Sequence, residues 1–176
     1  TSTINQESFE SVFAELLAKL KVVPVARAQI VADEMERTKT VLAAHLGIFY
    51  QDSLWDYLDA KGRYENTLTA IISVFEAEAL SRPIVVEIED GHWMDDSSKE
   101  LLHELIRRIG HHPIWVLTTC RYLDDGTKPT LVDEGLLEEL DLPVMDIDLK
   151  FLQEDAVRQF AESSLGAENT EEYIEL

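Results

Sequence analysis

"PIVVEIEDGHWMDDSSKELLHELIRRIGHHPIWVLTT", residues 83–119, contains two short apolar runs with a longer amphipathic segment between them. Each run follows a proline and contains β-branched residues, which is typical of a buried strand. The segment between them has apolar residues at helical spacing and ends at Gly110, while Ser97 and Glu100 have the spacing of a capping box at its start. A strand, a helix and a strand in this order predict a βαβ unit with parallel strands and a right-handed crossover.

The residues before this unit are predicted to be helical throughout. Apolar residues recur at helical spacing over residues 5–20 and 24–48, and a short helix is predicted at 53–60. Residues 61–66 have a turn-like composition, and Asn66 is predicted to cap the helix that follows. The first half of the chain therefore contributes helices and no strand.

The residues after the unit predict elements of both kinds. A short helix is predicted at 130–140, and alternating residues at 143–149 indicate a third strand. A further helix is predicted over 153–166, and residues 169–176 have the pattern of another helix that has just begun. The predicted fold class is α/β, with a partial parallel sheet, flanking helices and a helix-rich N-terminal portion.

The composition narrows the possible partners. The chain has 176 residues and is 45% hydrophobic, which suits one globular domain with its own core. Its 35 acidic and 15 basic residues give a formal net charge of −20. A field of that sign repels phosphate backbones, so direct binding of nucleic acid is not expected, whereas a basic partner would suit it.

The cellular setting is also predicted from composition. The single cysteine, Cys120, cannot form an internal disulfide and is expected to be a buried apolar residue. The longest apolar runs have the length of a strand, so no membrane span is expected, and the polar N-terminus does not resemble a signal peptide. These features predict a cytoplasmic protein.

Acidic residues gather where the first predicted strand ends. Glu89 and Asp90 follow that strand, and in open α/β sheets ligands lie beyond the carboxyl ends of the strands. Two carboxylates there can hold Mg²⁺ and orient a water for attack on a phosphate. Arg121 ends the neighbouring strand, where a cation can stabilise a terminal phosphate. A second interpretation stays open, in which the acids form a solvated corner and Asp95 caps the helix.

Residues 82–109 resemble the Walker B region of the AAA-type P-loop ATPase module of signal-transduction ATPases with numerous domains (STAND), as found in multidomain bacterial regulators. The family pattern consists of a proline, an apolar strand, an acidic pair, His-Trp and an aspartate shortly before a serine or threonine that opens a helix. The residues that match it are Pro83, Glu89, Asp90, His92, Trp93, Asp95 and Ser97 or Ser98. Residues 113–126 are similar to the family's next strand, which ends in a sensor-like arginine. Residues 145–166 resemble the strand and helix that lead into the lid.

The match has local departures. Gly91 and Met94 stand where the family more commonly has Leu and Ala, and Glu87 is unusual inside the strand. These departures concern local packing more than the roles of the acids. The match covers residues 83–166, and the helical portion before it agrees with the family only in position and length.

The resemblance implies a division of the chain and roles for three residues. Residues 1–82 would be the helical portion of the module, 83–150 an αβ core with Walker B-like and sensor-like strands, and 151–176 the start of a truncated helical lid. Glu89 would help to bind Mg²⁺, Asp90 would contact the metal and polarise the attacking water, and Arg121 would sense the nucleotide. ATP and Mg²⁺ are the cofactors implied for the parent protein.

The resemblance also implies how the parent protein works. ATP binding and slow hydrolysis would switch the arrangement of domains in one polypeptide, with cyclase, kinase or DNA-binding domains and protein effectors as partners. The phosphate-binding motif G-x-x-x-x-G-K-[ST] begins at none of the seven glycines. In the family this loop precedes the helical stretch with which the chain begins, so the chain is expected to be a fragment without useful turnover alone.

Two other classes of function stay open. One is a non-catalytic scaffold that uses an ATPase-like fold for protein contacts, which the missing phosphate loop and the charge of −20 favour. The other is a metal-dependent hydrolase that uses Glu89, Asp90, His92 and Asp95 without a nucleotide. Metal binding without ATP would favour the hydrolase, and partner binding that is insensitive to ATP would favour the scaffold.

Overall fold

The structure is a computed structural model that describes residues 5–110, 112–149 and 154–165. The chain divides between Leu142 and Pro143 into two units, which are described separately. Gly166 and the helix beginning predicted at 169–176 lie outside the described residues. Within the described ranges, no helix combines the length and apolarity needed to cross a membrane.

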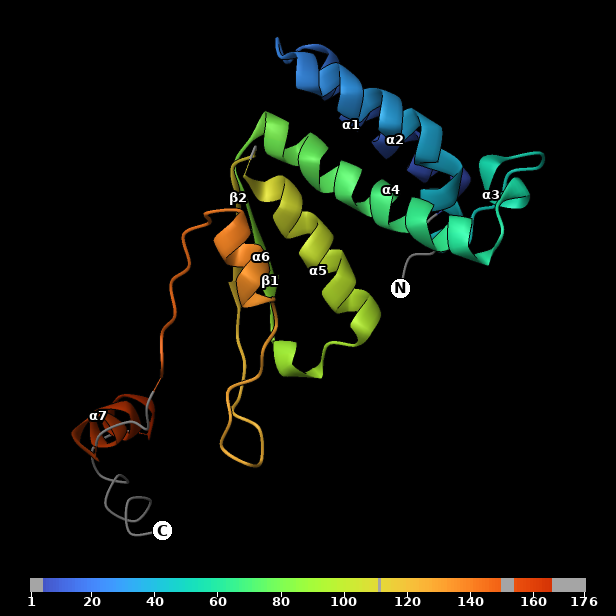
Figure 1. Ribbon diagram of the computed structural model, residues 1–176. Coiled ribbons are helices and arrows are strands. Elements are labelled where there is room, and N and C mark those ends of the chain that lie inside the picture. Colours follow the sequence, from blue (N-terminus) through green and yellow to red (C-terminus); the bar gives the residue numbers. More distant parts are fainter. Residues whose placement is uncertain (1–4, 111, 150–153, 166–176) are drawn as a thin grey trace. The chain divides into compact units, whose positions relative to one another are not determined.

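The first unit begins with a layer of helices, shown in Figure 1. The helices are α1 (Gln6–Lys21), α2 (Ala26–His45), the short α3 (Leu54–Tyr57) and α4 (Ala60–Ser81). Helix α1 buries one apolar face because its large side chains recur every three or four residues. The buried core of this layer consists of Phe9, Phe13, Leu16, Leu20, Ala28, Val31, Ala32, Met35, Ala43, Ile48 and Ala77. The helical prediction for this half of the chain is confirmed.

Helix α4 begins earlier than the sequence predicts. It starts at Ala60, and the side chain of Asp59 accepts a hydrogen bond of 2.7 Å from the Gly62 N–H. Residues 61–66 are therefore helical rather than a turn, and Asn66 donates to the Gly62 carbonyl oxygen inside the helix. The predictions of a turn and of an Asn66 cap are wrong. A good cap and the packing of a long helix outweigh the low helix propensity of one glycine.

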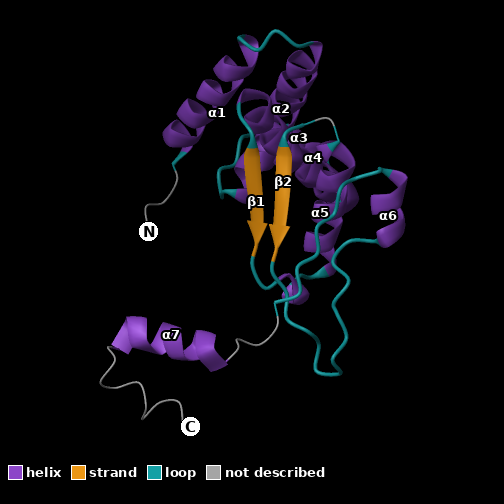
Figure 2. Ribbon diagram, turned by 90° about the vertical axis from the view of Figure 1, so that its left-hand side faces the viewer, coloured by secondary structure: helices purple, strands orange, loops and turns teal. Residues whose placement is uncertain are grey.

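The βαβ unit is confirmed. Strand β1 (Ile84–Ile88) is followed by the short 3₁₀ helix η1 (Gly91–Trp93), helix α5 (Asp96–Ile109) and strand β2 (Ile114–Thr118). The strands pair in parallel, with Ile84 opposite Ile114 and Ile88 opposite Thr118. Figure 2 shows them side by side and pointing in the same direction. Their carboxyl ends therefore meet at one edge of the unit.

The two faces of this small sheet have different surroundings. On one face, Ile84, Val86, Ile114 and Val116 pack with Phe75 and Ala79 of α4 and Leu105 of α5. On the other face, the exposed fractions are 62% for Val85, 74% for Trp115 and 51% for Leu117. Because side chains alternate along a strand, one covered face leaves every second residue open to solvent.

Helix α4 joins the helical layer to the sheet. Its Ala77 is fully buried in the helical core, and its Ala79 is 2% exposed in the sheet core. Small side chains let the neighbouring elements approach the helix closely from both sides. Helix α6 (Glu134–Glu139) is the last helix of the first unit, and its Leu136 packs against Leu102 and Ile106 of α5.

The second unit contains helix α7 (Glu154–Leu165) and a preceding extended segment. The third strand predicted at residues 143–149 is not formed, and its Val144, Met145, Ile147 and Leu149 are exposed. A strand needs a neighbour to satisfy its backbone N–H and C=O groups, and no described residue pairs with this segment as a strand. Alternation of side chains indicates an extended segment but does not supply its partner.

Candidate functional site

The candidate site lies where the two parallel strands end, and its backbone continues the strand pairing. The Thr119 N–H donates to the Ile88 carbonyl oxygen at 3.0 Å, and the Gly91 N–H donates to the Thr119 carbonyl oxygen at 2.8 Å. The Asp90 N–H donates to Oγ1 of Thr119 at 3.2 Å. These bonds hold the loop after β1 against the chain that leaves β2.

Asp90 and Arg121 come together at this edge. Oδ1 of Asp90 lies 3.8 Å from Nε of Arg121, and the two side chains are 46% and 80% exposed. Asp90 has a left-handed backbone conformation with φ of 49°, which aspartate tolerates better than most residues and which turns the chain sharply after the strand. The ion pair is solvent-accessible, so a ligand arriving from solvent can reach both partners.

His92 lies beneath the ion pair. Its side chain is 9% exposed, and its Nδ1 accepts a hydrogen bond from the Arg121 N–H at 3.3 Å. The same nitrogen lies 4.0 Å from Oδ1 of Asp90. His92 therefore holds the backbone at Arg121 in place.

A side chain at position 91 would require Leu131 to move. A Cβ on Gly91 would lie 2.8 Å from Cδ1 of Leu131 and 3.4 Å from Sγ of Cys120. Leu131 occupies the space that a larger residue at position 91 would need. Cys120 is exposed, so the prediction that it is buried is wrong: it lies beyond the end of β2, where the sheet no longer covers alternate residues.

Asp95 opens helix α5. Its side chain accepts a hydrogen bond from the Ser98 N–H at 2.7 Å, and this bond holds the pKa of the carboxyl below its ordinary value. The cap predicted for Asp95 is confirmed, whereas the capping box predicted from Ser97 and Glu100 is wrong. The helix begins before Ser97 because Asp95 already caps it by accepting from the Ser98 N–H, and Glu100 instead accepts from the Tyr64 hydroxyl at 2.5 Å.

Glu89 is exposed beside Asp90, and Trp93 is 80% exposed at the end of η1. Among the described residues, no three His, Cys, Asp or Glu side chains are grouped as a metal site would require. Glu89 and Asp90, adjacent in the chain, nevertheless supply the type of ligand that Mg²⁺ takes, since this ion is commonly held by one or two carboxylates together with substrate phosphates.

A second polar cluster was not foreseen from the sequence. Glu76 of α4 is buried and contacts Arg27 of α2, Arg108 of α5 and His112, which precedes β2. Its sequence context, "IISVFEAEAL" at residues 71–80, places an acid among apolar residues in a helix. Such an acid is a signal for a buried ion pair, but the sequence does not identify its partners.

Comparisons with known proteins find little that is similar. No family model and no solved structure matches the chain. The chain is similar to an uncharacterized protein of Rhizobium meliloti (strain 1021), with 38% identity over 63 residues. The matched stretch is 36% of this chain and 6% of that protein, so the chain spans a small part of its relative.

Proposed function

We propose that this chain is an interior part of the ATP-binding and ATP-hydrolysing module of a multidomain cytoplasmic signalling protein. The observation that carries the proposal is the approach of the Asp90 carboxylate to within 3.8 Å of Arg121 at the carboxyl ends of two parallel strands. Ligands of open α/β sheets bind at such edges. The resemblance of residues 82–109 to the Walker B region gives this edge a specific chemistry.

Each polar residue at the edge has a role in this proposal. Glu89 and Asp90 would hold Mg²⁺, which supplies positive charge to offset the phosphate oxygens. Asp90 would also orient the attacking water, and a phosphate would offer Arg121 a second anionic partner. His92 would keep Arg121 in position through its bond to the backbone N–H.

The size of the relative supports a multidomain parent. The similar stretch is 6% of the Rhizobium meliloti protein, which is therefore several times longer than this chain. In the proposal, other domains of the same polypeptide respond to the nucleotide state of the module. The phosphate-binding loop would come from a part of that polypeptide outside these 176 residues.

The test measures Mg²⁺-dependent phosphate release from ATP by the full-length parent protein and its Asp90→Asn variant. The amide keeps the shape of the side chain but cannot act as a base, so kcat should fall about a hundredfold or more. Asp124→Asn is the matched control, because Asp124 is an exposed acid in the loop after Arg121 and should leave kcat unchanged. Equal kcat values for the Asp90 variant and the wild type would sink the proposal, as would a parent that binds no nucleotide.

A second candidate is a non-catalytic protein-interaction module. The specific observation that favours it is the apolar open face of the sheet, where Val85, Trp115 and Leu117 are each more than half exposed. Exposed apolar groups of this kind often mark interaction surfaces. Partner binding that is lost in Trp115→Ala and insensitive to ATP would support this candidate. The metal-dependent hydrolase has no comparable support, because no three-ligand group occurs among the described residues.

A further inference from the structure

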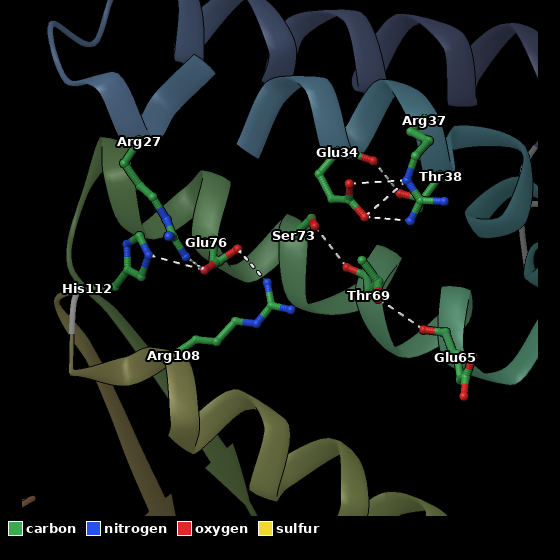
Figure 3. Close-up of polar contacts among 10 residues, drawn as sticks. All are labelled: Arg27, Glu34, Arg37, Thr38, Glu65, Thr69, Ser73, Glu76, Arg108 and His112. Carbon is green, nitrogen blue, oxygen red and sulfur yellow. Dashed lines mark hydrogen bonds and ion pairs between the residues drawn. The ribbon is translucent and has the colours of Figure 1, made fainter. Parts of the chain in front are cut away.

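A cavity of about 210 Å³ lies between α2, α4 and α5, on the side of the helical layer that meets α5. Figure 3 shows the charged residues of its lining, Arg27, Glu34, Glu76 and Arg108, together with several of their polar neighbours. Its lining consists of Arg27, Ile30, Val31, Glu34, Thr69, Glu76 and Arg108. The cavity is distinct from the site at the carboxyl ends of β1 and β2, because neither Asp90 nor Arg121 lines it.

Glu76 holds two arginines in place at this cavity. Its side chain is 3% exposed, with Oε1 at 2.8 Å from Nη2 of Arg27 and Oε2 at 3.3 Å from Nη1 of Arg108. Nε2 of His112 lies 3.3 Å from Oε1. A buried carboxylate bound on both oxygens fixes the guanidinium groups, so little rotamer freedom remains to be lost when a ligand arrives.

The charged lining consists of two arginines and two glutamates, but one of these glutamates, Glu34, is paired with Arg37 outside the lining. Glu76 balances one of its two arginines, and Arg37 balances Glu34, which accepts from Nε of Arg37 at 3.2 Å and 3.1 Å. The same hydrogen bonds hold the pKa of Glu34 below its ordinary value, so this carboxylate stays ionised near neutral pH. Arg27 and Arg108 therefore share the single carboxylate of Glu76, which leaves room for one more negative charge, and the ionised Glu34 repels a dianion more strongly than a monoanion.

The two arginines retain donors for such a ligand. A guanidinium has five N–H donors, and Glu76 takes one from each arginine in the contacts given above. The Arg27 and Arg108 side chains are 41% and 32% exposed, so both are accessible to a small molecule.

The remaining wall consists of Thr69 and two apolar residues of α2. Ile30 is 59% exposed and Val31 is 2% exposed, and both line the cavity near Arg27 of the same helix. A short aliphatic chain would cover Ile30 while its charged end meets Arg27 and Arg108. The volume is below the 300 Å³ or more that is usual for drug-sized ligands, which limits the occupant to a few heavy atoms.

We propose that this cavity is a binding site for a free short-chain aliphatic monocarboxylate, with Arg27 and Arg108 binding the carboxylate and Ile30 contacting the alkyl chain. This site is independent of the proposed ATPase function. A ligand bound there would contact both α2 and α5. Helix α5 begins shortly after the loop that follows β1.

The test is a titration of the full 176-residue chain with butyrate at constant ionic strength. The chemical shifts of the backbone amides, measured by NMR, monitor binding. Saturable shifts are expected for the amides of Ile30 and Arg108. Butylammonium at the same concentrations should cause no such shifts, and inorganic phosphate should bind more weakly. Saturable shifts with butylammonium, equal or tighter binding of phosphate, or no saturation with butyrate would overturn the proposal.

Three variants locate the site. Arg108→Gln should weaken butyrate binding about tenfold or more, because a charge-assisted hydrogen bond is lost. Ile30→Glu should weaken butyrate binding to a similar extent, because it places a carboxylate at the cavity wall. Ile30 is largely exposed, so this variant should fold and can test the site even if Arg108→Gln does not fold. Arg107→Gln is the matched control, because Arg107 pairs with Glu104 and does not line this cavity. Equal weakening by Arg107→Gln, or no weakening by Ile30→Glu, would count against the site.

Discussion

Glu76 is the residue on which three segments converge. It is 3% exposed and ion-paired to Arg27 and Arg108, and it also contacts His112. Removing one member of a buried ion pair leaves its partners without compensation for their lost hydration. The arginines here are partly exposed, so water can solvate part of their charge and reduce the penalty.

We expect Glu76→Gln to lower the free energy of unfolding by about 3 kcal/mol, toward the lower end of the range for breaking a buried pair. The amide retains the shape and one acceptor but loses the charge that attracts two guanidinium groups. Urea denaturation followed by circular dichroism measures this change.

The matched control is Glu78→Gln in the same helix. Glu78 pairs with Arg82, whose side chain is 71% exposed, so this variant should change the free energy of unfolding by less than about 1 kcal/mol. If the two variants lost equal free energy of unfolding, the Glu76 contacts would contribute no more to stability than a surface ion pair does.

At the scale of elements, strand β2 has one packed face and one open face. Ile114 is 6% exposed and lies in the core between the sheet, α4 and α5, whereas its neighbour Trp115 is 74% exposed. Purely parallel sheets are generally covered on both faces, so the open face is unusual. A pair of substitutions at adjacent positions compares the two faces directly.

Ile114→Ala should lower the free energy of unfolding by about 3 kcal/mol, because it removes buried apolar atoms and leaves a cavity. Trp115→Ala should change it by no more than about 0.5 kcal/mol, as expected for an exposed site. Urea denaturation of the 176-residue chain and of each variant measures both changes. A loss for Trp115→Ala as large as that for Ile114→Ala would mean that this face is covered in solution.

At the scale of the whole molecule, charge is the dominant feature. A formal net charge of −20 over 176 residues makes the folded chain repel itself, and this repulsion opposes the compact state. Salt shortens the screening length from about 30 Å at 0.01 M to about 10 Å at 0.1 M. The repulsion between distant acids should therefore weaken first, while close ion pairs such as those of Glu76 are screened less.

The melting temperature should rise when NaCl is increased over this range, and KCl should act alike because the effect depends on ionic strength. Differential scanning calorimetry at pH 7 measures it. A melting temperature that falls with added salt would show that attraction between surface ion pairs outweighs the general repulsion between acids.

The sequence by itself determined the helical first half, the βαβ unit and the residues that follow each strand. These properties depend on local periodicity and on turn and cap residues, which act over a few positions. It also placed Glu89 and Asp90 after the first strand, whereas the prediction that the second strand ends at Arg121 is wrong, because β2 ends at Thr118 and Arg121 follows three residues later. Their roles with ATP and Mg²⁺ stay predictions.

Only the tertiary structure decided which distant groups meet. The approach of Arg27, Arg108 and His112 to Glu76 depends on how α2, α4 and α5 pack, which no local pattern specifies. The segment 143–149 alternates like a strand, yet pairing needs a partner strand that the pattern cannot supply. Local periodicity therefore indicates the type of each element. Long-range packing decides which elements pair and forms the cavity lined by Arg27, Glu76 and Arg108.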